Sequence, residues 1–298
     1  GGTQERLQST EDTLWAGGPY DPANPDALEA WPQVKELIFA GRYREAHNLI
    51  GQKMMAKPLT QMPYQCMGDL LLSFPDANGV TDYRRDLNLD TAVATVVYTI
   101  DTVRYKREVF ASPVDQVIVV RLTADKPSKI VFTASMTTRQ KASVTVESPG
   151  TLVMQGVNGG ASGIAGGLRF QSRVVVTTSG GQITTGDGQI TVTGADSAVL
   201  LIAAATSYKS FKDVTGDPEA LTQETLAKAS KKSFETMLKD HVAEHQTNRW
   251  LQIVGITPEF SKWDRVLAIA LVVWNGAWFL TFVVVTALNL IAPFPHHW

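Results

Sequence analysis

Two adjacent carboxylates stand near the start of the chain, Glu11 and Asp12 in the segment EDTLWAGGPYDPANP. Glycoside hydrolysis requires a pair of carboxyl groups, one to protonate the leaving oxygen and one to guide water or attack the sugar. The two groups must flank the scissile bond, about 5–9.5 Å apart across the sugar. Adjacent residues of a strand point to opposite faces, so this pair is a poor candidate and the sequence assigns no catalytic residue.

The same segment has a simpler structural interpretation, which is favoured. Gly17, Gly18 and Pro19 are residue types that turn a chain, and Trp15 can bury a large apolar body. A further role stays open, because carboxylates suit sugar hydroxyls and aromatic rings suit sugar C–H faces. Asp12 and Trp15 are therefore predicted to contact carbohydrate.

Three other motifs have a functional and a structural interpretation. Cys66 could act as a nucleophile, but a lone cysteine is more often a small core residue. His241 and His245 have a spacing that suits metal ligands, but the acid in HVAEH adjoins the second histidine instead of the first, and no third ligand is evident. The glycine-rich residues 156–167 lead into a strand-like segment instead of a helix, which disfavours a phosphate cradle. The sequence predicts no metal and no cofactor.

Further acids lie in the strand-like region, where each has a plain surface interpretation. They are Asp69, Asp82, Asp86, Asp90, Glu108 and Asp115. They flank arginines, or lie at strand ends and on solvated faces, and surface ion pairs of this kind are common. None shows the spacing of a catalytic dyad.

Composition excludes some classes of protein. A chain of 298 residues with 44% hydrophobic and 19% charged residues is long and apolar enough to fold into one or two domains. The formal charge of −2 gives no basic face, so a nucleic-acid partner is not expected.

The elements that would position these residues are mostly strands. Ten short segments rich in Val, Ile, Thr and aromatic residues predict an antiparallel sandwich. They are 69–74, 91–100, 103–112, 116–124, 129–137, 142–148, 151–157, 168–178, 189–194 and 198–207. Turn residues separate them, among them Gly180-Gly181 and Asp187-Gly188.

Helices are predicted on either side of the strands. Before them, Pro32 suits a first helical turn and Gly41 a helix end, which indicates a small helical hairpin. After them, Asp217 can cap a helix over 217–246, with Pro218 at its first position. Residues 266–292 carry no charge and exceed the roughly 20 residues that cross a bilayer, which predicts a transmembrane helix. Lys262 and Arg265 would then place the preceding domain in the cytoplasm.

Six motifs together resemble the N-terminal domain of glycoside hydrolase family 95, whose members are mainly α-L-fucosidases. The motifs are ERLQSTEDTLWAGGPYDPANPDA, IFAGRYREAHNLI, MPYQCMGDLLLSF, DYRRDLNLDTAVATVVYT, REVFASPVDQVIVVRLTAD and YKSFKDVTGDPEA. The resemblance covers residues 1–246. It implies a β-supersandwich that packs through a helical linker on a separate (α/α) toroid, where inverting hydrolysis of α-L-fucosides in glycans takes place. The family usually acts in a secreted or periplasmic location.

The chain departs from this family at three places. Ser9-Thr10 stand where the family usually has Leu-Asn, and Cys66 stands where proline is common. After DHVAEHQ the resemblance ends, and the tail weakly resembles a transmembrane segment of sodium:solute symporters. The chain also begins inside a familiar motif, so an N-terminally truncated sandwich is expected.

The predicted fold class is mainly β, an antiparallel β-supersandwich with a small helical hairpin, a C-terminal linker helix and a hydrophobic tail helix. The expected parts are the sandwich domain 1–216, the linker helix 217–246, a connector 247–265 and the transmembrane helix 266–292. The expected function is that of a non-catalytic fucosidase domain whose partners are the toroid and a fucosylated glycan. The alternatives are a carbohydrate-binding module tethered to a membrane through 266–292, and a chimeric fragment with a transporter-derived tail.

Overall fold

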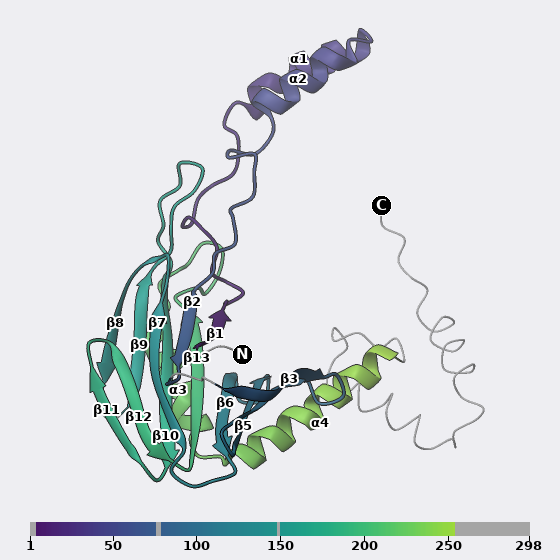
Figure 1. Ribbon diagram of the computed structural model, residues 1–298. Coiled ribbons are helices and arrows are strands. Elements are labelled where there is room, and N and C mark those ends of the chain that lie inside the picture. The colour runs from purple at the N-terminus through teal and green to yellow at the C-terminus, as the bar shows by residue number, and fades with distance from the viewer. Residues whose placement is uncertain (1–3, 76–78, 148–149, 254–298) are drawn as a thin grey trace, which may run out of the picture. The chain divides into compact units, whose positions relative to one another are not determined.

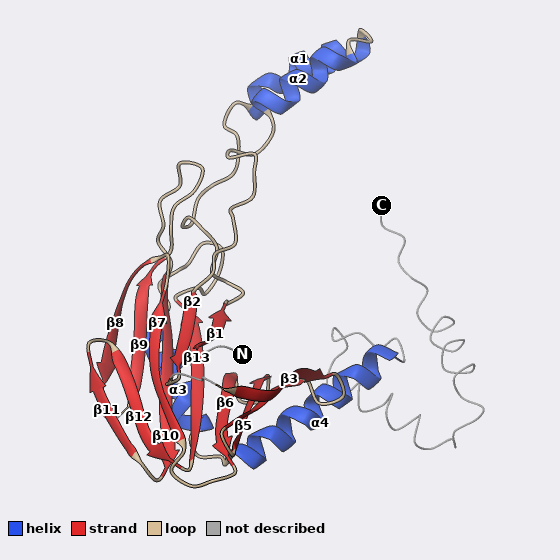
Figure 2. Ribbon diagram, viewed as in Figure 1, coloured by secondary structure: helices blue, strands red, loops and turns tan. Residues whose placement is uncertain are grey.

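A computed structural model describes residues 4–75, 79–147 and 150–253 (Figures 1 and 2). The chain forms two compact units, residues 1–241 and 242–298. The first unit contains every described strand, and the described part of the second is the end of one helix.

Two antiparallel sheets make up the first unit (Figure 2). The five-stranded sheet has the order β1 (Gln4–Ser9), β2 (Gly68–Ser73), β7 (Ile130–Thr137), β12 (Gln189–Ala195) and β11 (Gln182–Gly186). The eight-stranded sheet has the order β3 (Val80–Asn88), β4 (Val93–Ile100), β5 (Val103–Ser112), β6 (Val117–Ala124), β13 (Ser197–Thr206), β10 (Arg169–Ser179), β9 (Thr151–Val157) and β8 (Lys141–Glu147). The predicted mainly-β antiparallel fold is confirmed.

The main core lies between the two sheets because their strands alternate in burial. In β2 and β7 every second side chain is buried, as expected for strands with one face toward a core. Phe132 and Ile190 of the smaller sheet share one apolar cluster with Leu152 and Leu200 of the larger sheet. This shared cluster joins the two sheets into a sandwich.

Two strands, β3 and β11, were not predicted from the sequence, and β1 lay outside the ten segments predicted from residue pattern. β3 is polar and exposed along most of its length, and β11 is short, so neither gives the apolar signal of a strand. β1 pairs with β2, from Gln4 opposite Ser73 to Ser9 opposite Gly68. Ser9, at the position where an apolar residue was expected, is buried and its hydroxyl donates to the carbonyl of Gly68 at 3.0 Å.

The predicted glycine turns are confirmed on both sides of β11. Gly180 and Gly181 have φ of 69° and 71°, and Asp187 and Gly188 have φ of 47° and 70°. Asp187-Gly188 joins the paired strands β11 and β12, where positive φ at both central residues is the geometry of a tight hairpin turn. Gly180-Gly181 instead turns the chain from β10 of the larger sheet into β11 of the smaller sheet.

Helices cover the outer face of the eight-stranded sheet. α3 (Pro218–Ala229) contacts β10 and β13, and Leu226 and Met237 share a second apolar cluster with Phe110. Asp217 caps α3 by accepting from two backbone amides, as predicted.

The single helix predicted over 217–246 is wrong in detail, since two helices span this region. A break at 230–233 separates α3 from α4 (Phe234–Ile253), and the Ser233 hydroxyl accepts from the backbone N–H of Thr236 to begin α4. α4 continues past residue 246 into the expected connector.

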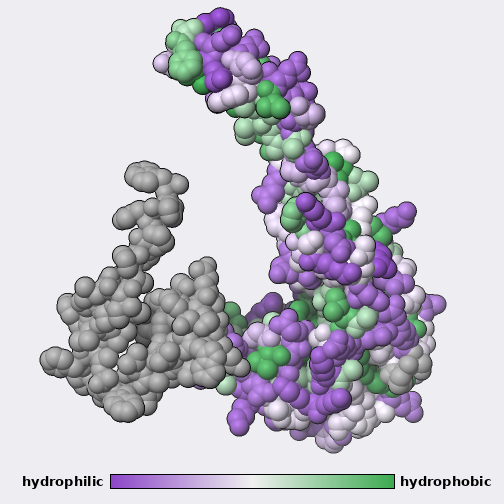
Figure 3. Space-filling view, turned by 180° about the vertical axis from the view of Figure 1, so that it is seen from behind, coloured by the Kyte–Doolittle hydropathy of each residue, from purple (hydrophilic) through white to green (hydrophobic). Residues whose placement is uncertain are grey.

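The predicted helical hairpin is confirmed as α1 (Ala27–Phe39) and α2 (Tyr43–Lys53). Val34 and Ala46 are buried, and Gly41 between the helices has φ of 72°. The expected start was wrong, because α1 begins before Pro32 and contains it. Apolar residues stand among polar ones on the outer surface of the hairpin (Figure 3).

The predicted transmembrane helix at 266–292 lies outside the described residues, as does most of the connector. Within residues 4–75, 79–147 and 150–253, none of the helices has the length and apolarity needed to span a bilayer.

Candidate functional site

A hollow of about 430 Å³ opens among the loops at one end of the sandwich. Three stretches of chain line it, within 13–22, 61–62 and 208–214, together with Leu168. Each stretch adjoins the end of a strand: the first follows β1, the second precedes β2 and the third follows β13. The site is therefore assembled from segments that are far apart in the sequence.

The first stretch is fixed by pairing with the residues before β2. The amide of Ala16 donates to the carbonyl of Pro63 at 2.9 Å, and that of Gln65 donates to the carbonyl of Leu14 at 2.9 Å. Leu14 is fully buried in the main core. The loop that carries Trp15 is thus anchored to the sandwich on both sides of that residue.

The indole of Trp15 is held in one orientation. Its Nε1–H donates to the backbone carbonyl of Asp12 at 2.9 Å, and the Tyr64 ring packs edge-on with the ring centroids 5.1 Å apart. The Tyr64 hydroxyl donates to the carbonyl of Glu11 at 2.8 Å. Trp15 nevertheless stays 39% exposed, so part of its ring is open to solvent in the hollow.

Asn158 ties the glycine-rich loop to this segment. Its amide nitrogen donates to the carbonyls of Trp15 and Gly17, both at 2.6 Å. Its amide oxygen accepts from the backbone N–H groups of Gly167 and Leu168, both at 2.9 Å. All four hydrogen-bonding positions of the side chain are therefore used, and the residue is 5% exposed.

The glycine-rich residues form a loop between strands β9 and β10, as predicted. Glycine is needed where this loop crosses itself: a Cβ on Gly166 would lie 2.0 Å from the carbonyl oxygen of Asn158. Gly17 of the facing segment has φ of 80°, a conformation that favours glycine. The described part of this loop opens no helix, so it has none of the geometry of a phosphate cradle.

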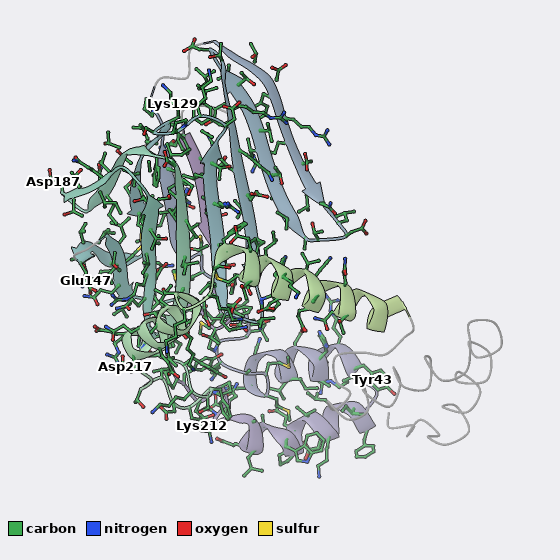
Figure 4. All side chains as sticks on the ribbon, turned by 90° about the horizontal axis from the view of Figure 1, so that it is seen from below. Tyr43, Lys129, Glu147, Asp187, Lys212 and Asp217 are labelled. Carbon is green, nitrogen blue, oxygen red and sulfur yellow. The ribbon has the colours of Figure 1, made fainter. Side chains whose placement is uncertain are left out.

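The third stretch is a compact turn after β13 that presents two aromatic rings. Ser210 and Asp213 exchange backbone hydrogen bonds, each at 3.0 Å. Tyr208 and Phe211 are 43% and 73% exposed and line the hollow. Figure 4 shows Lys212 in this turn.

A hydroxyl contact connects the first stretch to the end of β13, from which the third stretch follows. The hydroxyls of Thr13 and Thr206 are hydrogen-bonded to each other, and that of Thr13 also donates to Glu11 Oε2 at 2.6 Å. Burial raises the pKa of the Glu11 carboxyl, hydrogen bonds from Thr13 oppose this, and neighbouring Asp12 adds to the rise. The Glu11 carboxylate thus accepts hydrogen bonds from a residue of its own loop.

Of the two predicted carbohydrate contacts, the structure places Trp15 in the hollow and Asp12 outside its lining. The Asp12 side chain is exposed, and its backbone carbonyl orients the Trp15 ring. The residues that line the hollow include no Asp, Glu, Lys, Arg or His. The hollow therefore offers stacking and neutral hydrogen bonds.

Most of the other acids occupy ion pairs, and the paired Asp69, Glu108 and Asp115 side chains are at most 16% exposed. Asp69, Asp86, Glu108 and Asp115 lie 2.6–2.9 Å from the charged nitrogens of Arg6, Arg84, Lys106 and Lys232 respectively. Asp82 lies at an irregularity in β3, with φ of 52°, and Asp90 lies in the turn after β3. These positions place the acids in ion pairs with neighbouring cations or in irregular backbone and turns.

The remaining candidates occupy structural positions. The Cys66 thiol is half-buried and lies 3.4 Å from the carbonyl oxygen of Ser9. His241 is buried and stacks on Phe110, with the ring centroids 4.7 Å apart. Within the described stretches of the chain, no three potential metal-ligating side chains come together.

Tyr208, Phe211, Gln61 and Met62 were not predicted as site residues. They fall in SYKSFKDVTG and QMPYQC, segments that give a sequence signal for loops and none for a ligand. Only the pairing of the strands brings them to Trp15.

Comparison with known proteins identifies relatives of the domain. Residues 1–211 match the family model described as Glycosyl hydrolase family 65, N-terminal domain. Alpha-L-fucosidase 2 of Arabidopsis thaliana is 32% identical over 272 residues, which cover 83% of this chain and 32% of the relative. Probable alpha-fucosidase A of Aspergillus niger is 25% identical over 268 residues, covering 82% and 32%.

These matches bear out a glycoside hydrolase N-terminal domain, although the matching family model carries the number 65 instead of the predicted 95. The chain spans about a third of the length of the curated relatives it matches. The resemblance of the tail to sodium:solute symporters finds no support in the comparisons.

Proposed function

Because the chain belongs to the family of glycosyl hydrolase family 65 N-terminal domains, we propose that it is the non-catalytic N-terminal domain of an α-L-fucosidase-type glycoside hydrolase. The observation that carries the proposal is the 32% identity to Alpha-L-fucosidase 2 over 83% of this chain. The parent reaction would be the inverting hydrolysis of α-L-fucosides in glycans. Its partner would be an (α/α) toroid that supplies the catalytic groups, in keeping with the resemblance to family 95.

A non-catalytic role agrees with the arrangement of the described acids. Cleavage of a glycosidic bond needs two carboxyl groups that face one another across a sugar-sized space. The hollow has that space, but the residues around it carry no carboxylate. Glu11, two residues before the lining residue Thr13, accepts hydrogen bonds at Oε2 from the amide and the hydroxyl of Thr13 within its own loop.

In this proposal the sandwich supports the Trp15 loop beside a sugar. The loop is held by main-chain bonds, by Tyr64 and by Asn158, so its ring is presented without a large loss of conformational entropy on binding. Asp12 stays part of the proposal as a contact at the outer rim, where its exposed carboxylate can reach a sugar hydroxyl.

A domain exchange tests the fucosidase assignment. Residues 4–246 replace the matching third of Alpha-L-fucosidase 2, and release of fucose from an α-1,2-fucosylated oligosaccharide is measured. We expect the exchanged enzyme to retain activity, because the replaced surface supports a related catalytic domain. An exchange with an unrelated β-sandwich is the control, and an inactive but folded exchanged enzyme would contradict the assignment.

The non-catalytic part has its own test. The purified chain is incubated with the same oligosaccharide, and no release of fucose is expected. Turnover that disappears when one of its acids is replaced, with contaminating hydrolase excluded, would place an active site on the sandwich and overturn this part of the proposal.

A further inference from the structure

Four aromatic residues from two separate loops line the hollow: Trp15, Tyr20, Tyr208 and Phe211. Trp15 follows β1, whereas Tyr208 and Phe211 follow β13, and all three line the same space. Their exposed fractions of 39%, 43% and 73% are high for large apolar side chains. Exposed apolar groups that gather in a concave region mark a binding site more often than scattered ones do.

The Trp15 ring can offer only its apolar surface to a ligand. Its one polar group, Nε1–H, is already bonded to the Asp12 carbonyl at 2.9 Å, and Tyr64 packs against the ring edge-on. What stays exposed is therefore a fixed apolar surface. Such a surface suits the C–H face of a pyranose ring, whose hydroxyl groups project from its edge.

Neutral polar groups stand beside these rings. Gln61 and Ser210 line the hollow and can each donate and accept hydrogen bonds. A few polar groups within an apolar lining are the usual composition of a small-molecule site, and the volume of about 430 Å³ falls in the usual range for such sites.

The hollow has no charged lining residue, and the nearby lysines are directed within their own turn. Lys209 Nζ donates to the Thr215 hydroxyl at 3.0 Å and lies 3.9 Å from an oxygen of Asp213. Lys212 Nζ lies 5.3 Å from the centre of the Phe211 ring. A charged ligand would lose its hydration without gaining an opposite charge in the lining.

We propose that this hollow binds an uncharged sugar ring, stacked between Trp15 and the Tyr208–Phe211 turn, with Gln61 and Ser210 bonding its hydroxyls. The proposal deepens the proposed function, on which it rests for the choice of L-fucose as a probe. It assigns sugar binding to the sandwich itself, apart from any catalytic pocket.

The test measures binding to the full chain by saturation-transfer NMR and calorimetry. The probes are L-fucose, D-galactose and D-galacturonate. For a single ring on an open site we expect saturable binding of the two neutral sugars with Kd on the order of 1–10 mM. D-Galacturonate should bind at least about tenfold more weakly, because its carboxylate would lose hydration without gaining an opposite charge in the lining.

Two variants locate the site, and two matched variants control for the loss of an exposed aromatic ring. Trp15→Ala and Phe211→Ala should each weaken binding of L-fucose about tenfold. Trp31→Ala and Phe39→Ala remove rings that are 45% and 87% exposed on α1, away from the hollow lining, and should bind as the wild type does. Phe211 is 73% exposed, so Phe211→Ala should leave the fold intact. This variant therefore decides the test if Trp15→Ala loosens its own loop.

The inference would be overturned if neither L-fucose nor D-galactose showed saturable binding. Unchanged binding in both hollow variants, or galacturonate binding as tight as that of galactose, would also overturn it. Failure here is distinguishable from failure of the proposed function. An active domain exchange without sugar binding by the chain refutes this inference alone, whereas sugar binding with an inactive exchange refutes the fucosidase assignment alone.

Discussion

Replacing Asn158 should loosen the loop that presents Trp15, although Asn158 does not itself line the hollow. Its side chain donates to the carbonyls of Trp15 and Gly17 and accepts from the amides of Gly167 and Leu168. No other described side chain has hydrogen bonds to both of these loops. Asn158→Ala removes all four bonds at once.

The size of the effect follows from burial. Each hydrogen bond contributes about 1 kcal/mol net, and a buried group left without a partner costs about 1–3 kcal/mol. Water entering the space left by the amide offsets part of that cost, so we expect a loss of about 3–4 kcal/mol. In a domain of this size each kcal/mol lowers Tm by about 2–4 °C, which predicts a fall of about 10 °C.

Thermal unfolding of the full chain measures this prediction. The control is Asn88→Ala, which removes an exposed asparagine whose side-chain oxygen accepts from the amides of Asp90 and Thr91. A Tm for Asn158→Ala within 2 °C of that control would refute the reasoning, because about 1 kcal/mol or less would then separate a buried four-bond side chain from an exposed one.

The isosteric change Asn158→Asp separates geometry from hydrogen bonding. Its carboxylate can still accept from Gly167 and Leu168, but it places a negative oxygen against two carbonyl oxygens that now lie 2.6 Å from the amide nitrogen. We expect it to lose stability at neutral pH and to recover part of it in acid, where a protonated carboxyl can donate to one carbonyl. A deficit independent of pH would contradict this account.

Three further predictions concern other contacts. Burial raises the pKa of Glu11 above 4.5, so its charge lowers stability at neutral pH and Glu11→Gln should raise Tm at pH 7. The difference in Tm should shrink as the pH falls through the raised pKa toward 4.5, where the carboxyl becomes protonated in the folded and the unfolded chain. Hydrogen bonds to Asp115 and Asp240 raise the pKa of Lys232 above 10.5. The protonated amine therefore contributes to folding stability below pH 10.5, and this contribution is lost as the pH rises through the raised pKa. Lys232→Met should accordingly lower Tm at pH 7. Gly166→Ala drives a Cβ to within 2.0 Å of a carbonyl oxygen and should cost about 1–3 kcal/mol in denaturant unfolding.

Matched variants decide two of these predictions. Lys231 is exposed and adjoins Lys232, so Lys231→Met should leave Tm nearly unchanged, and an equal loss in both variants would exclude the ion pair as the cause. Gly186 has open space around its Cβ position, so Gly186→Ala should have little effect, and an equal cost would exclude the clash at Gly166.

Local sequence was sufficient for most of the fold. The ten predicted strands all exist, because each is rich in Val, Ile, Thr or aromatic residues and turn residues separate them. β3 was missed because VTDYRRDLN is exposed and polar, and pairing with β4 decides its conformation. The linker helix was predicted unbroken because the break at 230–233 has no proline or glycine to mark it.

The candidate site was predictable only in part. Trp15 could be predicted from its own segment, because an aromatic residue among turn residues suits the C–H face of a sugar. Phe211 could not, since nothing in SYKSFKDVTG connects that turn to a segment almost 200 residues earlier. Asp12 was predicted for the same role from its residue type. In the structure, its backbone carbonyl accepts the hydrogen bond from the Trp15 indole.

The strands determine which loops meet at the hollow. Ser9 pairs with Gly68 at one end of β1 and β2, and Phe170 pairs with Thr206 where β10 begins and β13 ends. These pairings bring the loops after β1 and β13 to the same end of the sandwich, where the hydroxyls of Thr13 and Thr206 meet. A shift of one residue in either register would turn the following loop to the other face of its sheet. Contact of Trp15 and Phe211 with one ligand therefore depends on buried strand residues as much as on the loops that touch it.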